Sequence, residues 1–224
     1  YEIGSGLVGS EMCIRDSGYI GGGLYHSQNI EGALATLPGA RIVCPSFADD
    51  AAGLLRTAMR SRGFTLYLEP KALYNSVEAS SVVPEEFEVP FGKARIRREG
   101  TDLSMITYGN TTHFCLNVAE RLAQEGWSVE VIDLRSLIPL DKETIYASVK
   151  KTSKALVVHE DKVFSGFGAE IAAGIGTELF RYLDAPVQRV GSVFTPVGFH
   201  PILEKAILPT EDKIYDAART LLEY

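Results

Sequence analysis

The sequence has little cysteine, no long apolar run and no excess of positive charge, and each absence excludes a class of protein. Its three cysteines, Cys13, Cys44 and Cys115, are too few and too widely spaced for a disulfide framework or a metal knuckle. Sparse cysteine favours a reducing compartment, so we expect a cytoplasmic location. The formal net charge of -7 argues against nonspecific nucleic-acid binding, which requires clustered positive charge. The apolar stretches are too short to span a bilayer.

A glycine fingerprint for dinucleotides is also missing. The run Gly21-Gly22-Gly23 does not have the GxGxxG spacing and follows no recognisable strand. We therefore expect no saturable binding of NADH, which disfavours a nicotinamide-dependent enzyme.

Residues 1–17 have neither helical nor alternating periodicity, and they lack the basic and apolar blocks of a signal peptide. They resemble translated sequencing-adapter sequence. We interpret this segment as an artefactual or disordered leader and expect the chain to be a fragment whose amino-terminal half is missing.

The whole chain has 46% hydrophobic and 23% charged residues, which is typical of an ordinary globular protein, and regular patterns begin at Gly18. In the first part, apolar patterns predict a short helix over 29–37, strands over 41–44 and 64–68, and a helix that Ser46 caps and Gly63 ends. Residues 69–100 are loop-like, and we assign a linker between two domains to 81–91.

The second part alternates strands and helices regularly. We predict strands over 103–107, 128–133, 155–159 and 187–190, and helices over 111–125, 141–151, 167–183 and 210–224. This alternation predicts an α/β fold with a mostly parallel sheet and helices on both faces.

The glycine run is followed by Leu24-Tyr25-His26-Ser27-Gln28. Glycines allow the backbone to approach a ligand closely, and a histidine beyond them can titrate near neutral pH. From these residues alone, a catalytic role for His26 and a structural role, with the ring buried and bonded to Ser27 or Gln28, are about equally favoured.

Several ordered blocks resemble the beta subunit of the thiamine-diphosphate-dependent 2-oxo acid dehydrogenases. In the first part these are GGGLYHSQ, PGARIVCPSFADDAAGLL and LYLEPKALY. In the second part they are EGTDLSMITYG, VEVIDLRSLIPLD, VVHEDKVFSGFGAEIA and DAPVQRV. The pair Leu24-Tyr25 before His26 is more similar to the branched-chain enzymes than to the pyruvate enzymes.

The resemblance implies a transketolase-like architecture. Residues 18–80 would be the carboxy-terminal part of a pyrimidine-binding domain, and residues 92–224 would be a transketolase carboxy-terminal-type domain. It also implies oxidative decarboxylation of branched-chain 2-oxo acids with acyl transfer to lipoyl groups. Thiamine diphosphate and magnesium would be held mainly by an alpha subunit. The expected partners are that alpha subunit, a second beta subunit and the lipoyl acyltransferase core, in a bacterial cytoplasm. The fragment alone should be inactive.

The resemblance assigns the catalytic role to His26, which would stabilise charge on an oxygen or protonate the lipoyl sulfur. Tyr25 and Gln28 are weaker candidates that would line the same cofactor-binding cleft. A monovalent-cation site near Ala58, Ser61 and Gly63 is left open, and we assign no metal. Other histidines are interpreted as structural, and Arg135 as an ion-pair partner rather than a substrate clamp. The remaining histidines are His113, His159 and His200.

Two alternatives remain. Within the class, the chain could belong to a pyruvate or acetoin dehydrogenase, because much of the substrate pocket would come from missing residues. Outside it, this truncated form could be a noncatalytic assembly module.

Overall fold

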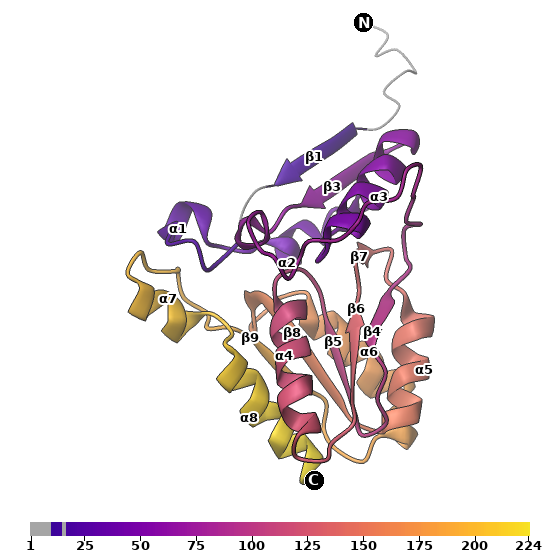
Figure 1. Ribbon diagram of the computed structural model, residues 1–224, viewed down its shortest axis with the longest axis vertical. Helices are drawn as coiled ribbons and strands as arrows, with labels where there is room; N and C mark the ends of the chain where they lie inside the picture. The colour runs from indigo at the N-terminus through magenta and orange to yellow at the C-terminus, as the bar shows by residue number, and fades with distance from the viewer. Residues whose placement is uncertain (1–9, 15–16) are drawn as a thin grey trace, which may run out of the picture.

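Two sheets organise the chain, and strands from both parts of the sequence contribute to the smaller one (Figure 1). The computed structural model describes residues 10–14 and 17–224. The smaller sheet has the order β1-β3-β2-β7. Strands β1 and β2 run parallel to β3, whereas β7 pairs antiparallel with β2. Their bounds are β1 Ser10–Ile14, β2 Arg41–Val43, β3 Phe64–Leu68 and β7 Ser136–Ile138.

The larger sheet has the order β4-β6-β5-β8-β9 and is parallel except for β4. Its strands are β4 Arg95–Arg98, β5 Leu103–Thr107, β6 Val129–Asp133, β8 Ala155–Lys162 and β9 Gln188–Ser192. The three central strands are almost entirely buried, as expected for strands covered on both faces, and polar residues such as Ser104 and Glu130 are buried with them.

Helices cover both faces of the larger sheet, and alternate residues of each strand serve the two faces. Met105, Val131 and Val158 belong to the core shared with α4 Thr111–Ala123 and α8 Glu211–Leu222. The neighbouring positions Ile106, Ile132 and Val157 belong to the core shared with α5 and α6. These two helices span Lys142–Thr152 and Gly168–Glu178. The sheet therefore sits between two apolar layers.

Short helices and one longer helix surround the smaller sheet. The longer one, α3 Ala48–Arg60, packs Leu54 against Val43 and Tyr67. The short ones are α1 Gly23–His26, α2 Glu31–Leu34 and the 3-10 helix η1 Lys71–Leu73. In the second part, η2 spans Phe180–Tyr182 and α7 spans Pro201–Ile207.

The prediction of an α/β fold with a mostly parallel sheet is confirmed, and most predicted elements lie within a few residues of their observed bounds. The predicted helix over 167–183 is shorter, because α6 ends at Glu178 and a 3-10 turn follows. Strand β4 lies in the segment that was expected to be loop-like. Strand β7 and helix α7 were not predicted.

Two further predictions differ from the structure. Ser10–Ile14, inside the segment interpreted as a leader, forms β1 and pairs with β3, while residues 1–9 and 15–16 lie outside the described part of the chain. Ser46 does not cap α3, because the cap position is Phe47. The Ser46 hydroxyl instead donates a hydrogen bond to Asp133 Oδ1 at 3.0 Å. The division into domains at residues 80 and 92 stays a prediction.

A buried ion-pair network joins α3 to the larger sheet. Arg135 Nη1 lies 2.7 Å from Asp50 Oδ1, and Arg97 Nη2 lies 2.7 Å from Asp133 Oδ2. Arg97 also pairs with Asp50, so that the network is continuous. The side chains of both aspartates are fully buried. The interpretation of Arg135 as an ion-pair partner is therefore confirmed.

No helix of the described residues is both long enough and apolar enough to cross a membrane.

Candidate functional site

The predicted site residues lie on one tight turn at the edge of the molecule. Gly21 and Gly23 have φ angles of 65° and 58°, a left-handed conformation that glycine adopts without strain. The Ser27 hydroxyl oxygen accepts a hydrogen bond from Gly22 N at 2.9 Å and closes the turn. Helix α1 follows from this geometry and ends at His26.

The structure presents this turn outward. Tyr25 is 75% exposed, and His26 is also exposed. Gln28 Nε2 donates to Leu24 O at 3.1 Å, and Gln28 lines a recess of about 20 Å³ together with Glu31 and Cys44. The alternative of a buried structural His26 is therefore not what the structure shows. An outward turn can form one wall of a cleft whose other wall belongs to another chain.

The carboxyl end of β8 carries His159, Glu160 and Asp161, and all three are buried. Among the described residues, the two ring nitrogens of His159 are buried atoms without a hydrogen-bond partner. Its ring stacks parallel to that of Tyr108 with centroids 6.3 Å apart. Burial lowers the pKa of His159 to about 4, and the charge of Arg189 acts in the same direction. His159 is thus a neutral packing residue, in agreement with its structural interpretation.

Glycines make this packing possible. A Cβ at Gly168 would lie 2.2 Å from His159 Nε2, and one at Gly166 would lie 2.0 Å from Lys162 O. The close packing where α6 starts therefore depends on these two glycines.

Glu31, which no sequence motif marks as a site residue, is buried where α2 begins. One of its carboxylate oxygens accepts a hydrogen bond from the Tyr108 hydroxyl at 2.9 Å. Burial, followed by the nearby charge of Asp161, raises the pKa of Glu31 to about 7. Burial also raises the pKa of Glu160 to about 8, and the charges of Glu31 and Glu204 add to the rise. Carboxyl groups therefore gather where the His26 segment meets β8.

These pKa values predict that stability falls as the pH rises from about 5 to about 8. In the unfolded chain Glu160 ionises near its ordinary value of 4.5, whereas in the folded chain it keeps its proton up to about pH 8. Between those values the unfolded state binds fewer protons, so raising the pH favours unfolding. Thermal unfolding midpoints measured across this range should decline, and Glu160→Gln should flatten the decline. An equally steep decline in that variant would contradict the prediction.

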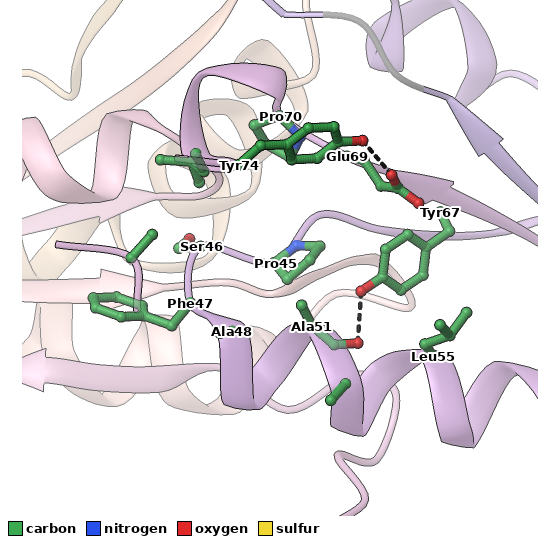
Figure 2. A pocket seen from close by; sticks show the side chains of 13 residues that line it. Pro45, Ser46, Phe47, Ala48, Ala51, Leu55, Tyr67, Glu69, Pro70 and Tyr74 are labelled. Carbon is green, nitrogen blue, oxygen red and sulfur yellow. Dashed lines mark hydrogen bonds between the residues drawn. The ribbon is translucent and has the colours of Figure 1, made fainter. Parts of the chain in front are cut away.

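A cavity of about 360 Å³ lies next to the smaller sheet (Figure 2). Its walls come from the start of α3 and from the segment after β3. The Tyr67 hydroxyl donates to Ala51 O at 2.6 Å, and the Tyr74 hydroxyl donates to Glu69. The lining is mostly apolar, with Pro45, Phe47, Ala48, Leu55, Pro70 and Leu73 among its members. It contains none of the predicted site residues.

The other two histidines have structural contacts. His113 Nε2 lies 2.8 Å from Ser46 O, and His200 Nδ1 accepts from Ile202 N at 3.3 Å where α7 begins. Within the described ranges, no group of three or more histidine, cysteine, aspartate or glutamate side chains could hold a metal ion.

Comparisons with known proteins point to one family. Residues 92–214 match the family described as "Transketolase, C-terminal domain". The chain is 40% identical over 208 residues to the 2-oxoisovalerate dehydrogenase subunit beta of Bacillus subtilis (strain 168), covering 92% of this chain and 63% of that protein. It is also 40% identical over 211 residues to a pyruvate dehydrogenase E1 component subunit beta of Staphylococcus aureus (strain COL), covering 92% and 64%.

The chain thus spans just under two thirds of the length of these curated relatives. Among solved structures, a chain titled "Split gene transketolase, inactive beta4 tetramer" superposes with a TM-score of 0.74. That match has 22% sequence identity and covers 95% of this chain and 66% of the other. At this identity the match supports the fold alone.

Proposed function

This chain belongs to the transketolase C-terminal domain family, and we propose that it is part of the beta subunit of a thiamine-diphosphate-dependent 2-oxo acid dehydrogenase of the branched-chain type. The full-length protein would decarboxylate branched 2-oxo acids oxidatively and pass the acyl group to lipoyl groups. The observation that carries the proposal is 40% identity to a 2-oxoisovalerate dehydrogenase beta subunit over nearly the whole chain.

The exposed turn supports a catalytic role for His26. When bound, thiamine diphosphate would supply the electron sink for decarboxylation. His26 would donate a hydrogen bond to the oxygen on which charge develops, or a proton to the lipoyl sulfur. Tyr25 is exposed beside it, and Gln28 lines the adjoining recess. We propose that both contribute to the wall of the same cleft.

The described residues fit one side of a shared cofactor site. A Cβ at Gly21 would meet nothing closer than 4.0 Å, so the backbone near the exposed imidazole has open space beside it, whereas Gly22 packs against His26 itself. The diphosphate and magnesium would be held by an alpha subunit. We further propose a second beta subunit and a lipoyl acyltransferase core as partners, in the cytoplasm of a bacterium.

A second candidate is pyruvate dehydrogenase, because beta subunits of that enzyme match at the same 40% identity. Substrate preference separates the two. A hydrophobic pocket discriminates between substrates that differ by a methylene by roughly 10- to 200-fold. We expect the full-length protein, reconstituted with its alpha subunit, to turn over 3-methyl-2-oxobutanoate with kcat/KM at least about tenfold above that for pyruvate.

The measurement is acylation of a purified lipoyl domain, with thiamine diphosphate omitted as the control. A preference for pyruvate would favour the second candidate. No turnover of any 2-oxo acid by a correctly assembled complex would reject the proposed activity and favour a noncatalytic assembly module.

A further inference from the structure

One kind of contact recurs where the segment that carries His26 meets the rest of the chain. On either side of His26, backbone N–H groups of glycines donate hydrogen bonds to oxygens of buried carboxyl groups from the second part of the chain. The contacts join Gly18 N to Glu160 Oε2 at 3.0 Å, Gly21 N to Glu204 Oε1 at 3.3 Å, and Gly32 N to Asp161 Oδ2 at 2.9 Å. Glu160 and Asp161 lie on β8, and Glu204 lies on α7.

At Gly18 and Gly32 the approach is too close for a side chain, whereas Gly21 has open space around it and is favoured there by its φ of 65°. A Cβ at Gly18 would lie 2.2 Å from Leu208 Cδ1, and one at Gly32 would lie 2.9 Å from the backbone oxygen of Ser165. On α1 itself, a Cβ at Gly23 would lie 2.6 Å from the ring of Phe199, just before α7. Helices α1 and α7 accordingly lie on the same side of the molecule (Figure 1).

The acceptors are costly to bury. Glu160 and Asp161 are each 4% exposed and Glu204 is 7% exposed, so none of them is well hydrated. A buried carboxyl group loses its solvation and regains part of it through hydrogen bonds from the protein. Here the backbone of the His26 segment donates one bond to each of the three groups, and Lys162 N donates a further one to Asp161 at 2.8 Å. The consequence is that the backbone on both sides of α1 is fixed, while the His26 side chain stays exposed.

We propose that Glu160, Asp161 and Glu204 are positioning residues that hold the His26 turn at the proposed cofactor cleft. The inference rests on the proposed function, because it presumes that His26 acts in catalysis. It assigns to the end of β8 and to α7 a role that sequence similarity does not specify. A displacement of about 1 Å in a catalytic group can cost on the order of 100-fold in rate.

Glu204 offers the sharpest test because it contacts the turn from a separate helix. In the full-length beta subunit assembled with its alpha subunit, Glu204→Ala removes the acceptor for Gly21 N, whereas Glu204→Gln keeps a carbonyl acceptor. We expect Glu204→Ala to speed hydrogen–deuterium exchange in peptides covering residues 18–32, and Glu204→Gln to restore slow exchange. The exposed Glu143→Ala on α5 is the matched control and should change nothing. Unchanged exchange in Glu204→Ala would overturn the proposal without bearing on the proposed function.

Kinetics test the consequence for catalysis. With a branched 2-oxo acid and a lipoyl domain, Glu204→Ala should lower kcat about ten- to 100-fold with KM nearly unchanged, and Glu204→Gln should recover most of the activity. In a His26→Ala background, Glu204→Ala should cause no further loss, because both changes remove the same contribution. If the two substitutions together lowered kcat by the product of their separate effects, Glu204 would have a general structural role and the inference would be overturned. If His26→Ala alone left activity intact, the proposed catalytic role would fail whatever the exchange data show.

Discussion

His26→Ala in the full-length complex is expected to lower the rate of lipoyl reductive acylation by about 10²- to 10⁴-fold. The side chain is exposed at the end of α1, so its removal leaves no cavity in a packed core. We therefore expect the complex to assemble normally and its unfolding temperature to be unchanged. The loss should appear in kcat, because a hydrogen bond or a proton delivered in the transition state does not contribute to substrate affinity. Single-turnover acylation of a lipoyl domain measures it directly.

A second substitution separates the two proposed roles of His26. His26→Gln keeps a hydrogen-bond donor but cannot deliver a proton near neutral pH. If the ring acts as a donor to an oxygen, this variant should retain much of the activity that His26→Ala loses. If it acts as a general acid, both variants should be equally slow. Lost assembly in His26→Ala, with normal turnover by whatever complex remains, would instead support the noncatalytic assembly module.

The sequence was sufficient for elements whose periodicity is set by burial. Strands β5, β6 and β8 lie between two helical layers, so adjacent apolar pairs such as Met105-Ile106 and Val131-Ile132 face opposite cores and indicate a buried strand. The N-terminus of α5 was also predictable, because Asp141 is its N-cap and accepts a hydrogen bond from Thr144 N. Interactions among neighbouring residues determine these elements, so the local sequence was enough to predict them.

Elements stabilised by distant partners were not predicted. Strand β7 has three residues and exists because it pairs with β2, which lies about a hundred residues earlier in the chain. Strand β1 likewise depends on β3 for its hydrogen bonds. Ser46 stands where a helix cap is expected, yet its hydroxyl bonds Asp133 in the larger sheet. In each case a contact remote in sequence determines the local structure.

The candidate site shows the same division. The glycine run next to His26 left a catalytic role and a buried structural role about equally favoured, and the structure places the side chain on an exposed turn. The carboxylates that fix it could not be identified in the same way. Glu204 follows in sequence by more than 170 residues, and only the folded topology brings its oxygen to Gly21 N. Its sequence signal is limited to an acidic side chain on a helix, which is normally a solvated residue.

Asp50→Ala is expected to destabilise the folded chain by about 3–5 kcal/mol, the usual cost of removing one partner from a buried ion pair. Asp50 is fully buried on α3, and its carboxylate pairs with Arg135 and Arg97. Both arginine side chains are less than one tenth exposed, so water cannot replace the lost charge. Arg97 would keep its ion pair with Asp133. The Arg135 guanidinium would keep its hydrogen bonds to the backbone oxygens of Lys93 and Ala94 but would lose its carboxylate partner.

Asp50→Ala should lower the free energy of unfolding by more than the worth of the hydrogen bonds of Asp50, because the substitution leaves a buried positive charge in excess. Urea unfolding of the full-length beta subunit would show a lower midpoint with an unchanged slope, since the surface exposed on unfolding is the same. Arg60→Ala is the control, because Arg60 lies on the same helix and makes exposed ion pairs with Glu86 and Glu88. This substitution should leave the urea midpoint unchanged. A loss below about 1 kcal/mol in Asp50→Ala would mean that water reaches Arg135 after the substitution. The network would then contribute orientation of α3 against the larger sheet rather than stability.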